Sequence, residues 1–374
     1  MSRFLISGGG TGGHLSPAIA LAEGLNARGH ETMVLISRKQ VDSRLSEKYP
    51  HLRFVRIPGS GFSLAPMALL RFAGSQLQAL VFCLRLMRQV RPHGVVGFGG
   101  FTSAPLVLAG RLTGVPSALH ESNRVPGRAI RTLGRFADRV YLPPGIRLPN
   151  LSVTAMRHVG LPVRREIVRN AAPAARAALG FDSQQRLLVV LGGSQGASSL
   201  NDWTRRHLPT FTAENIQVCC ITGLGKGRAG VEEFPGRTGS TVRTEFIAFS
   251  DRMGELLSAA DLVVSRAGAG TLAELIRCET PAVLVPYPEA ADDHQRANAE
   301  YFEREGGGLV VDQAQMETLH SVVLGALGND WLLRKMRSNL HRMDRANALE
   351  LMLADLEGIA RDESASRPRR ALSA

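Results

Sequence analysis

The segment RFLISGGGTGGHLSPA, residues 3–18, decides the fold, because it reads as a short apolar strand, a glycine-rich turn and the start of a helix. The same pattern begins afresh at residues 186–198, RLLVVLGGSQGAS. A strand, a glycine turn and a helix in succession are typical of α/β proteins built on parallel sheets. Two such starts in one chain therefore predict two doubly wound, Rossmann-like domains.

Apolar runs alternate with amphipathic segments along the rest of the chain, with one pause. Residues 142–149 are rich in proline and glycine, and GLP follows at 160–162. We expect a first domain over 1–162, completed by a C-terminal helix at about 342–360, and a second domain over 163–341. The tail, 363–374, should be disordered. Strands are expected at 3–7, 32–37, 54–57, 94–97, 117–119 and 139–142, then at 187–191, 216–221, 242–247, 262–265, 282–286 and 309–311.

The composition is that of a globular protein that does not cross a membrane. Of the 374 residues, 44% are hydrophobic and 21% are charged. The longest apolar stretches, near 79–86 and 104–110, are interrupted by arginines before they could span a bilayer, and residues 1–13 do not read as a secretory signal. The four cysteines lack the spacing of a zinc or redox motif, which favours buried thiols in a reducing compartment.

Positive charge is concentrated in the first domain. The chain has a net charge of +12, and residues 1–160 hold 20 Lys and Arg against 6 Asp and Glu. No acidic residue occurs between Lys48 and His120. Such a surface attracts nucleic acid, anionic lipid or a phosphorylated substrate, and charge alone does not choose among them.

The first glycine loop formally satisfies the dinucleotide fingerprint with Gly8, Gly10 and Gly13. That fingerprint also requires an acidic residue at the end of the second strand, where this chain has SRK at 37–39. A nicotinamide enzyme is therefore disfavoured, although an NADP-type basic replacement keeps it open. The exposed N–H groups of such a loop, at a helix start, are suited to a phosphate.

Three further glycine-rich turns follow predicted strands, at 97–105, 192–198 and 265–274. The first of them should meet the loop of the opening segment at one edge of a sheet. In the third, Glu274 can accept both hydroxyls of a ribose or simply complement a helix dipole. The amides of Gln295 and Asn298 suit sugar hydroxyls. The sequence contains no GxxxxGK[ST], HExxH or Asp-x-Asp motif, so we expect no metal site.

Seven motifs together resemble the MurG family, whose members move N-acetylglucosamine from UDP-N-acetylglucosamine (UDP-GlcNAc) to lipid-linked N-acetylmuramoyl-pentapeptide. The resemblance extends over about residues 3–340 and is specific because all seven occur in the family's order and spacing. They are GGTGGH (9–14), GFGGFTSAP (97–105), HESN (120–123), GLPVR (160–164), GGSQGA (192–197), SRAGAGTLAE (265–274) and HQRANA (294–299).

The resemblance implies the GT-B architecture, two Rossmann-like domains facing each other across a cleft. The first domain would take the undecaprenyl-diphosphate-linked acceptor and the second domain UDP-GlcNAc. A peripheral protein on the cytoplasmic face of the cell membrane is implied, with an anionic membrane surface and other cell-wall synthesis proteins as partners. No cofactor is required, although a divalent cation can assist the diphosphates. The positive first domain agrees with an acceptor that carries a diphosphate.

The resemblance also implies the contacts of individual residues. Donor contacts fall on Thr11, Gly12, Gly13, Asn123, Arg164, Ser194, Gln195, Gly196, Ser250, Gly268, Ala269, Gly270, Thr271, Glu274 and Gln295; acceptor contacts fall on Gly99, Gly100, Phe101, Thr102 and Ser103. Among these, Arg164 and Ser194 would contact the diphosphate region, and Gln295 the GlcNAc hydroxyls.

This chain departs from the family pattern at three places. The segment FIAFSDRM, 246–253, replaces the usual FIDDM, so that Ser250 stands where an isoleucine backbone contacts uracil. HESN replaces HEQN, and Phe101 replaces a tyrosine. A contact made by backbone survives the first change, and neither of the others removes a group that the chemistry needs.

The implied reaction is an inverting displacement, in which the acceptor's C4 hydroxyl attacks the anomeric carbon and UDP leaves. It requires a base, for which His14 is the candidate and Glu121 the second choice. The alternative is that His14 only caps or packs the glycine loop. Residues 62–91 read as a basic amphipathic helix, which either lies in the headgroup region of a membrane or contributes to the core.

Three other functions remain to be weighed against this one. A GT-B transferase acting on another lipid would need a different acceptor loop, and a UDP-GlcNAc epimerase matches the seven motifs poorly. A nucleic-acid-binding protein would explain the basic charge. Against it, only 5% of the residues are aromatic and no RNA or DNA module is recognisable, so we expect no nucleic-acid partner.

Overall fold

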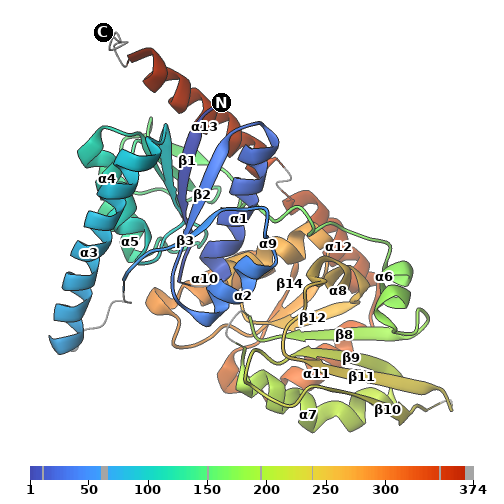
Figure 1. Cartoon of the computed structure of the whole chain (residues 1–374). Helices are drawn as coiled ribbons and strands as arrows, with labels where there is room; N and C mark the ends of the chain where they lie inside the picture. Colours follow the sequence, from blue (N-terminus) through green and yellow to red (C-terminus); the bar gives the residue numbers. More distant parts are fainter. Residues whose placement is uncertain are drawn as a thin grey trace, which may run out of the picture. The chain divides into compact units, whose positions relative to one another are not determined.

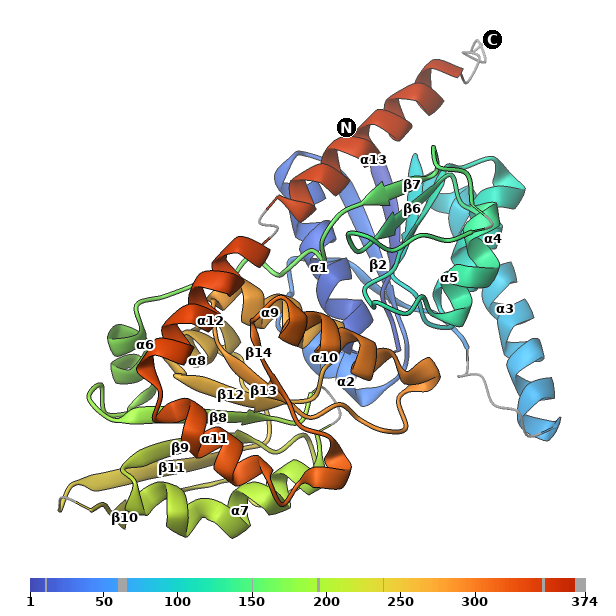
Figure 2. The same cartoon turned by 180° about the vertical axis from the view of Figure 1, so that it is seen from behind.

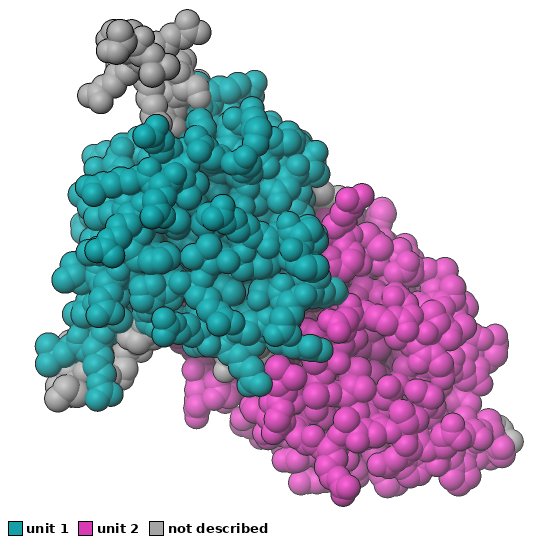
Figure 3. Space-filling model, viewed as in Figure 1, with its two compact units in different colours: residues 1–122, 126–164, 345–374 teal, residues 123–125, 165–344 magenta. Residues whose placement is uncertain are grey.

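The computed structural model describes residues 1–10, 12–59, 66–149, 151–193, 196–237, 239–344 and 347–366. The chain divides into two compact units, coloured separately in Figure 3. Unit 1 comprises residues 1–122 and 126–164 together with the C-terminal segment that contains helix α13 (Ala348–Ser366). Unit 2 comprises residues 123–125 and 165–344.

Unit 1 is built on a parallel sheet in the order β3-β2-β1-β4-β5-β6-β7. Its strands are β1 (Arg3–Ser7), β2 (Glu31–Ile36), β3 (Phe54–Arg56), β4 (Gly94–Gly97), β5 (Ser117–His120), β6 (Arg139–Leu142) and β7 (Met156–His158). The order reverses where β1 pairs with β4, Phe4 opposite Gly94 and Ser7 opposite Gly97. The loops after these two strands therefore open at the switch point of the sheet, where doubly wound folds bind ligands.

Helices cover both faces of this sheet (Figure 1). They are α1 (Gly12–Ala27), α2 (Gln40–Glu47), α3 (Pro66–Val90), α4 (Ser103–Thr113), α5 (Arg128–Leu133) and α13. Side chains alternate along β1, so that Phe4 and Ile6 enter the core under α1 and α13, whereas Leu5 enters the core under α3 and α4. Both faces are apolar because both are covered.

Helix α13 lies alongside α1 although the two come from opposite ends of the chain (Figures 1 and 2). Met352, Leu353 and Leu356 of α13 belong to the same buried cluster as the apolar residues of α1. Arg28, just after α1, pairs with Glu357 at 3.0 Å. The C-terminal helix therefore completes the core of the first domain.

Unit 2 repeats the plan in the order β10-β11-β9-β8-β12-β13-β14. The strands are β8 (Arg186–Leu191), β9 (Ile216–Ile221), β10 (Gly230–Pro235), β11 (Thr241–Ile247), β12 (Leu262–Ser265), β13 (Ala282–Leu284) and β14 (Gly308–Val310). The helices are α6 (Ala172–Leu179), α7 (Ser198–Ala213), α8 (Met253–Ala259), α9 (Ala269–Cys278), α10 (His294–Arg304), α11 (Leu319–Leu327) and α12 (Asp330–Met343). Here β8 and β12 pair at the switch point, and the edge strand β10 is antiparallel to β11.

The strands and the fold class expected from the sequence are confirmed, and each expected strand lies within two residues of its expected bounds. Two edge strands were missed: β10, because GVEEFP is acidic and largely exposed, and β7, which has only three residues and none of them buried. Helix α13 continues to Ser366 and so includes the first residues of the expected tail, and the disorder expected for 363–374 stays a prediction. No helix in the described part of the chain is long and apolar enough to cross a membrane. All four cysteines are buried and free, and burial raises the pKa of the Cys83 thiol to about 12.

Candidate functional site

The turn after β1 and the turn after β4 lie on neighbouring strands of unit 1. Gly10, Gly99 and Gly100 have φ angles of +115°, +94° and +72°, which residues with a side chain rarely adopt. Gly9 is required for a different reason, because a Cβ on it would lie 2.4 Å from the backbone nitrogen of Ser37. The bare backbone of both turns can therefore approach a ligand closely.

His14 lies in the first turn of α1 with its ring against the second glycine turn. A Cβ on Gly99 would lie 3.2 Å from His14 Nε2, and a Cβ on Gly100 would lie 3.3 Å from His14 Nδ1. His14 is half-buried. This location agrees with the expected place of His14 beside the acceptor loop, and its role as a base stays a prediction.

Gly12 and Gly13 begin α1, where the first N–H groups of a helix have no partner within the helix and favour an anion. Thr11 lies outside the described residues. The ring of Phe101 is half-buried beside the first turn, since a Cβ on Gly10 would lie 3.5 Å from Phe101 Cε1.

Thr102 and Ser103 hold the two turns together. Thr102 Oγ1 accepts a hydrogen bond from Ser7 Oγ at 2.8 Å and donates to the carbonyl oxygen of Gly9 at 3.2 Å. Ser103 Oγ donates to the carbonyl oxygen of Gly99 at 2.6 Å. Both side chains are buried, 1% and 0% exposed. Their hydroxyls therefore bond to the loops, and the expected acceptor contacts of these two residues stay a prediction.

Asp42 fixes the first turn from behind, and the sequence analysis missed it. Its Oδ2 accepts hydrogen bonds from the backbone N–H of Gly10 at 2.8 Å and from the N–H and hydroxyl of Ser37 at 3.0 and 2.5 Å. Lys39 Nζ donates to the carbonyl oxygen of Gly10 at 2.8 Å. The signal was available, because Asp42 is the first acidic residue after the second strand.

His120 ends β5 and Glu121 directly follows it, and both are buried, structural side chains. His120 Nε2 lies 3.2 Å from the carbonyl oxygen of Gly160, and burial lowers its pKa to about 4, so the ring is neutral at physiological pH. Glu121 is 4% exposed and its Oε2 accepts a hydrogen bond from the N–H of Gly127 at 2.6 Å. The structure thus favours the structural role for Glu121 over that of a second base.

Arg164 ends the 126–164 segment of unit 1 and is 8% exposed. Its guanidinium donates to the hydroxyl of Tyr49 at 3.2 Å. The contact with a donor diphosphate that the sequence implied for Arg164 stays a prediction.

In unit 2, the turn after β8 also depends on glycine. Gly196 has a φ of +67°, and a Cβ on it would lie 2.5 Å from the carbonyl oxygen of Thr222. A Cβ on Gly192 would lie 2.2 Å from the nitrogen of Ala197. Ser194 and Gln195, between these glycines, lie outside the described residues.

The turn after β12 begins α9. Gly268 is the N-cap of this helix, and Ala269, Gly270 and Thr271 form its first turn, all half-buried. Partial positive charge at a helix start favours a phosphate there. Glu274 is half-buried on the same helix.

Asn298 of α10 ties this turn to a segment far away in sequence. Its Nδ2 donates to Asn123 Oδ1 and to the carbonyl oxygen of Ala267, both at 3.1 Å, and its Oδ1 accepts from the N–H of Arg124 at 2.9 Å. Asn298 is 2% exposed. It therefore positions Asn123 beside the β12 turn. The sequence had predicted that its amide meets a sugar, but both ends of the amide are used within the protein.

Gln295 of α10 holds two loops with its amide oxygen, which accepts from the N–H groups of Ala267 at 3.2 Å and Tyr287 at 3.1 Å. Its amide NH2 donates no hydrogen bond within the described residues and is the end suited to a sugar hydroxyl. Ser250 lies half-buried in the loop between β11 and α8, where its hydroxyl accepts from the N–H of Arg252 at 3.2 Å. Its contact with uracil stays a prediction.

Arg266, directly after β12, braces the same turn. It is 7% exposed and donates to the carbonyl oxygen of Val285 and to Ser199 Oγ, both at 3.0 Å. Arg266 lies in the motif SRAGAGTLAE, whose sequence alone does not indicate this bracing role. Among the described residues, no three His, Cys, Asp or Glu side chains are grouped so that they could hold a metal ion.

Comparisons with known proteins match this chain to glycosyltransferases along most of its length. Residues 4–142 match the glycosyltransferase family 28 N-terminal domain, and residues 187–352 match the glycosyltransferase family 28 C-terminal domain. A protein of Opitutus terrae named "UDP-N-acetylglucosamine--N-acetylmuramyl-(pentapeptide) pyrophosphoryl-undecaprenol N-acetylglucosamine transferase" is 63% identical over 98% of this chain and 97% of its own length. A protein of Clavibacter sepedonicus with the same name is 38% identical over 99% of both chains.

Solved structures give the same result. The crystal structure of MurG from Acinetobacter baumannii superposes with a TM-score of 0.70 and 25% identity, covering 96% of this chain and 100% of that one. The glycosyltransferase of kitacinnamycin superposes with a TM-score of 0.69 at 17% identity, covering 96% of this chain and 98% of its own, and so shares the fold.

Proposed function

The chain belongs to the MurG family of glycosyltransferases, and on this premise we propose that it transfers N-acetylglucosamine from UDP-GlcNAc to lipid-linked N-acetylmuramoyl-pentapeptide in peptidoglycan synthesis. Family membership confirms the resemblance drawn from the seven motifs and the expected GT-B class of fold. The observation that carries the proposal is the identity of 63% to the Opitutus terrae transferase over nearly the full length of both chains.

Unit 2 supplies what a nucleotide-sugar donor requires without a metal. The turns after β8 and β12 present bare backbone and a helix start to the diphosphate. Glu274 would accept the ribose hydroxyls. The amide NH2 of Gln295 would donate to the sugar, because its oxygen is already used by Ala267 and Tyr287.

Unit 1 supplies the acceptor side. The backbone of Gly10, Gly99 and Gly100 would approach the acceptor diphosphate, with Phe101 beside it. The reaction forms a bond from the C4 oxygen of the muramoyl sugar to the anomeric carbon of GlcNAc and breaks the bond from that carbon to the UDP oxygen. The hydroxyl proton would pass to His14, and the leaving diphosphate would be stabilised by the helix start of α9.

The acceptor places the enzyme at the cytoplasmic face of the cell membrane, and α3 is the surface that would contact it. The inner side of this helix is core, because Ala79 and Cys83 are fully buried. The outer side carries Leu70, Leu77 and Val81, which are 69%, 63% and 40% exposed. Exposed arginines at 71, 85 and 88 accompany them, a combination suited to anionic lipid.

The test of the reaction is transfer of radiolabelled GlcNAc to a short-chain analogue of the lipid acceptor, with UDP-glucose and UDP-galactose as controls. Transfer from UDP-GlcNAc alone is expected. UDP-GlcNAc binding without transfer would leave the donor site in place and contradict the acceptor assignment.

Flotation with vesicles tests membrane contact separately. We expect binding that increases with acidic lipid and is weakened when Leu77 and Val81 are both replaced by Ser. Vesicle binding that does not depend on the fraction of acidic lipid would contradict the proposal that α3 contacts anionic lipid.

A further inference from the structure

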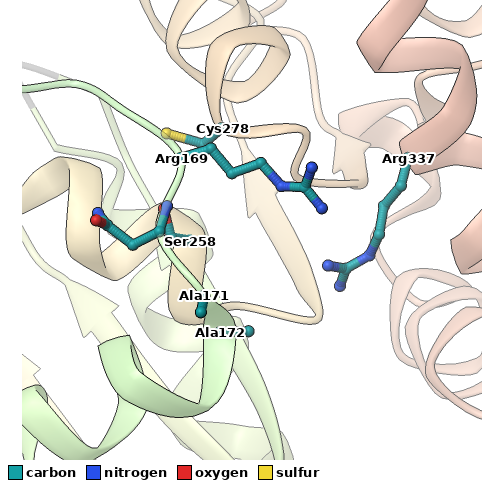
Figure 4. A pocket seen from close by; sticks show the side chains of 7 residues that line it. Arg169, Ala171, Ala172, Ser258, Cys278 and Arg337 are labelled. Atoms are coloured by element: carbon teal, nitrogen blue, oxygen red, sulfur yellow. The ribbon is translucent and has the colours of Figure 1, made fainter.

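A cavity of about 300 Å³ lies in unit 2 at the end of the sheet opposite the glycine turns (Figure 4). Ser258, which lines it, comes just before β12, whereas Gly268 of the glycine turn comes just after that strand. The two places are therefore separated by at least the length of β12. The lining residues are Arg169, Asn170, Ala171, Ala172, Ser258, Cys278 and Arg337.

Two arginines from different elements direct their guanidinium groups toward each other across this cavity (Figure 4). Arg169 comes from the segment before α6 and pairs with Glu279 at 2.7 Å, and its side chain is 54% exposed. Arg337 comes from α12 and donates to the carbonyl oxygens of Ala260 and Asp261 at 3.4 Å. Like charges that face each other repel, unless an anion lies between them.

Neighbouring carboxylates do not balance this positive charge. Asp261 is shared by three arginines, with Arg176 at 2.6 Å, Arg186 at 3.0 Å and Arg337 at 3.9 Å. An adjoining cavity of about 290 Å³ also contains Arg337, together with Arg186 and Arg334. Burial and the nearby arginines lower the pKa of Arg337, and Asp261 opposes them only in part.

Around the two cavities the described residues include more guanidinium groups than carboxylates. The groups are Arg169, Arg176, Arg186, Arg277, Arg334 and Arg337 against Asp261, Glu274, Glu279, Asp330 and Asp344. Arg186 is already paired with both Asp261 and Asp330. Arg169 has one carboxylate, Glu279, and Arg337 has only the shared Asp261 at 3.9 Å, and both guanidinium groups face the open volume.

Neutral donors line the remaining wall. Ala171 and Ala172 are the N-cap and the first residue of α6, and no side chain in the described part of the chain caps this helix start. The first turn contains no acidic residue. The backbone N–H groups of Ala172 and Ala174 at this helix start, where Pro173 has none, add to the attraction for an anion that the two arginines create.

We propose that this cavity is a second anion site, which binds the phosphate of a phosphomonoester between Arg169 and Arg337, apart from the UDP-GlcNAc site. The planar guanidinium forks suit phosphate oxygens. The volume is at the lower end of the range for small-molecule pockets, roughly 300–1,000 Å³, and leaves room for a small organic group beside the phosphate. A free phosphate ester and a lipid phosphate headgroup share this chemistry.

The first test is thermal unfolding of the full chain in sodium phosphate and in sodium chloride of equal ionic strength. Saturating UDP is present throughout, so that phosphate cannot report on the nucleotide site. We expect phosphate to raise the unfolding temperature saturably, and chloride not to. Equal effects of the two salts would overturn the proposal.

Variants then locate the site. Arg169→Gln should weaken phosphate binding about tenfold, because it removes one charge-assisted contact. Arg237→Gln is the matched control, since Arg237 is also an exposed arginine of unit 2 paired with one glutamate, Glu214. It should bind phosphate as the parent protein does. Equal phosphate affinity in R169Q and the parent protein would place the anion elsewhere and refute the assignment.

Arg337→Gln is a second test that depends on folding, because Arg337 also donates to the end of α8. R169Q keeps the proposal testable if R337Q does not fold, and unchanged UDP affinity in R169Q shows that the nucleotide site is intact.

Vesicles distinguish the two sources of phosphate. Binding to phosphatidylcholine vesicles with and without phosphatidic acid tests the lipid headgroup. Binding that requires phosphatidic acid and is lost in R169Q identifies a lipid headgroup. Phosphate binding that R169Q loses, with vesicle binding unchanged, identifies a soluble ester.

Discussion

Replacing Asp42 by Asn separates the two roles that this buried carboxylate combines, stability and the shape of the first glycine turn. Asp42 is 0% exposed, and its Oδ2 accepts three hydrogen bonds, one from Gly10 and two from Ser37. An asparagine has the same shape and keeps one oxygen but carries no charge. Its NH2 group would take the place of Oδ1, which is buried and has no hydrogen-bond partner among the described residues.

The magnitude follows from these contacts. A hydrogen bond to a charged group contributes roughly 1.5–3 kcal/mol and a neutral one about 1 kcal/mol, so each of the three bonds is weakened. Asparagine also avoids the cost of burying a charge, which leaves a net loss of about 2 kcal/mol. One unsatisfied buried donor adds about 1 kcal/mol. We expect D42N to lower the free energy of unfolding by about 2–4 kcal/mol. A turn that is less well held should also raise KM for the acceptor about tenfold, which corresponds to about 1.4 kcal/mol.

The assay is GlcNAc transfer with each substrate varied in turn, beside urea unfolding of the same preparations. KM for UDP-GlcNAc should change less than KM for the acceptor, because most of the expected donor contacts belong to unit 2, whereas the turn that Asp42 holds is expected to meet the acceptor. Asp138→Asn is the control, because Asp138 Oδ2 accepts from the N–H of Ser117 at 2.8 Å, at the start of β5, the opposite end of the sheet. Lower stability with an unchanged acceptor KM would refute the reasoning that Asp42 positions the acceptor loop.

Three further predictions concern the donor turns and pH. Asn298→Ala should lower the free energy of unfolding by about 2–4 kcal/mol through its three hydrogen bonds and weaken UDP-GlcNAc binding, measured by urea unfolding and calorimetry. Gly192→Ala should abolish donor binding, measured by calorimetry, because the added Cβ would lie 2.2 Å from the backbone nitrogen of Ala197. Gly193→Ala is the control: its φ is +75° and its added Cβ would have no atom within 4 Å, so it should cost only about 1–2 kcal/mol of backbone strain. Burial lowers the pKa of His120 from 6.5 to about 4, so only the unfolded chain takes up this proton, and stability should fall by about 3 kcal/mol as the pH drops from 6.5 to 4. Urea unfolding at several pH values in this range measures how steeply the free energy of unfolding depends on pH. His120→Gln should reduce this dependence by the equivalent of about one proton, and an unchanged dependence would refute the role of His120.

The sheets could be predicted from the sequence because their strands are buried on both faces. Such strands read as continuous apolar runs, as LLVVL at 187–191 does, and a glycine turn after each one marks its end. The edge strand β10 could not be found in this way, because its side chains are exposed and its pairing with β11 supplies the order. The extra turn of α13 escaped notice because residues 363–366, ESAS, have the composition of a tail.

At the site, the sequence predicted which turns matter but not which atoms in them face a ligand. Thr102 and Ser103 were expected to contact the acceptor, yet each hydroxyl bonds to a glycine carbonyl only a few residues away or on the neighbouring turn. Asn298 was expected to meet a sugar, and it instead bonds to Asn123, 175 residues away in the sequence, and to the β12 turn. Contacts between residues so far apart in the sequence cannot be inferred from motif spacing, because they depend on how the strands and helices pack in the folded protein.

One physical reason connects these corrections. A turn made of glycine exposes its backbone to a ligand, but glycine also loses the most conformational entropy when it is fixed. The protein holds each such turn through buried polar side chains behind it, Asp42 and Thr102 in unit 1, Arg266 and Asn298 in unit 2. Ligand contacts made by backbone then tolerate changes in exposed side chains, as in HESN and FIAFSDRM, whereas a change in the buried supports should alter the turn itself. Substitutions of the supports should therefore change substrate affinity more than substitutions of exposed side chains around the same turns.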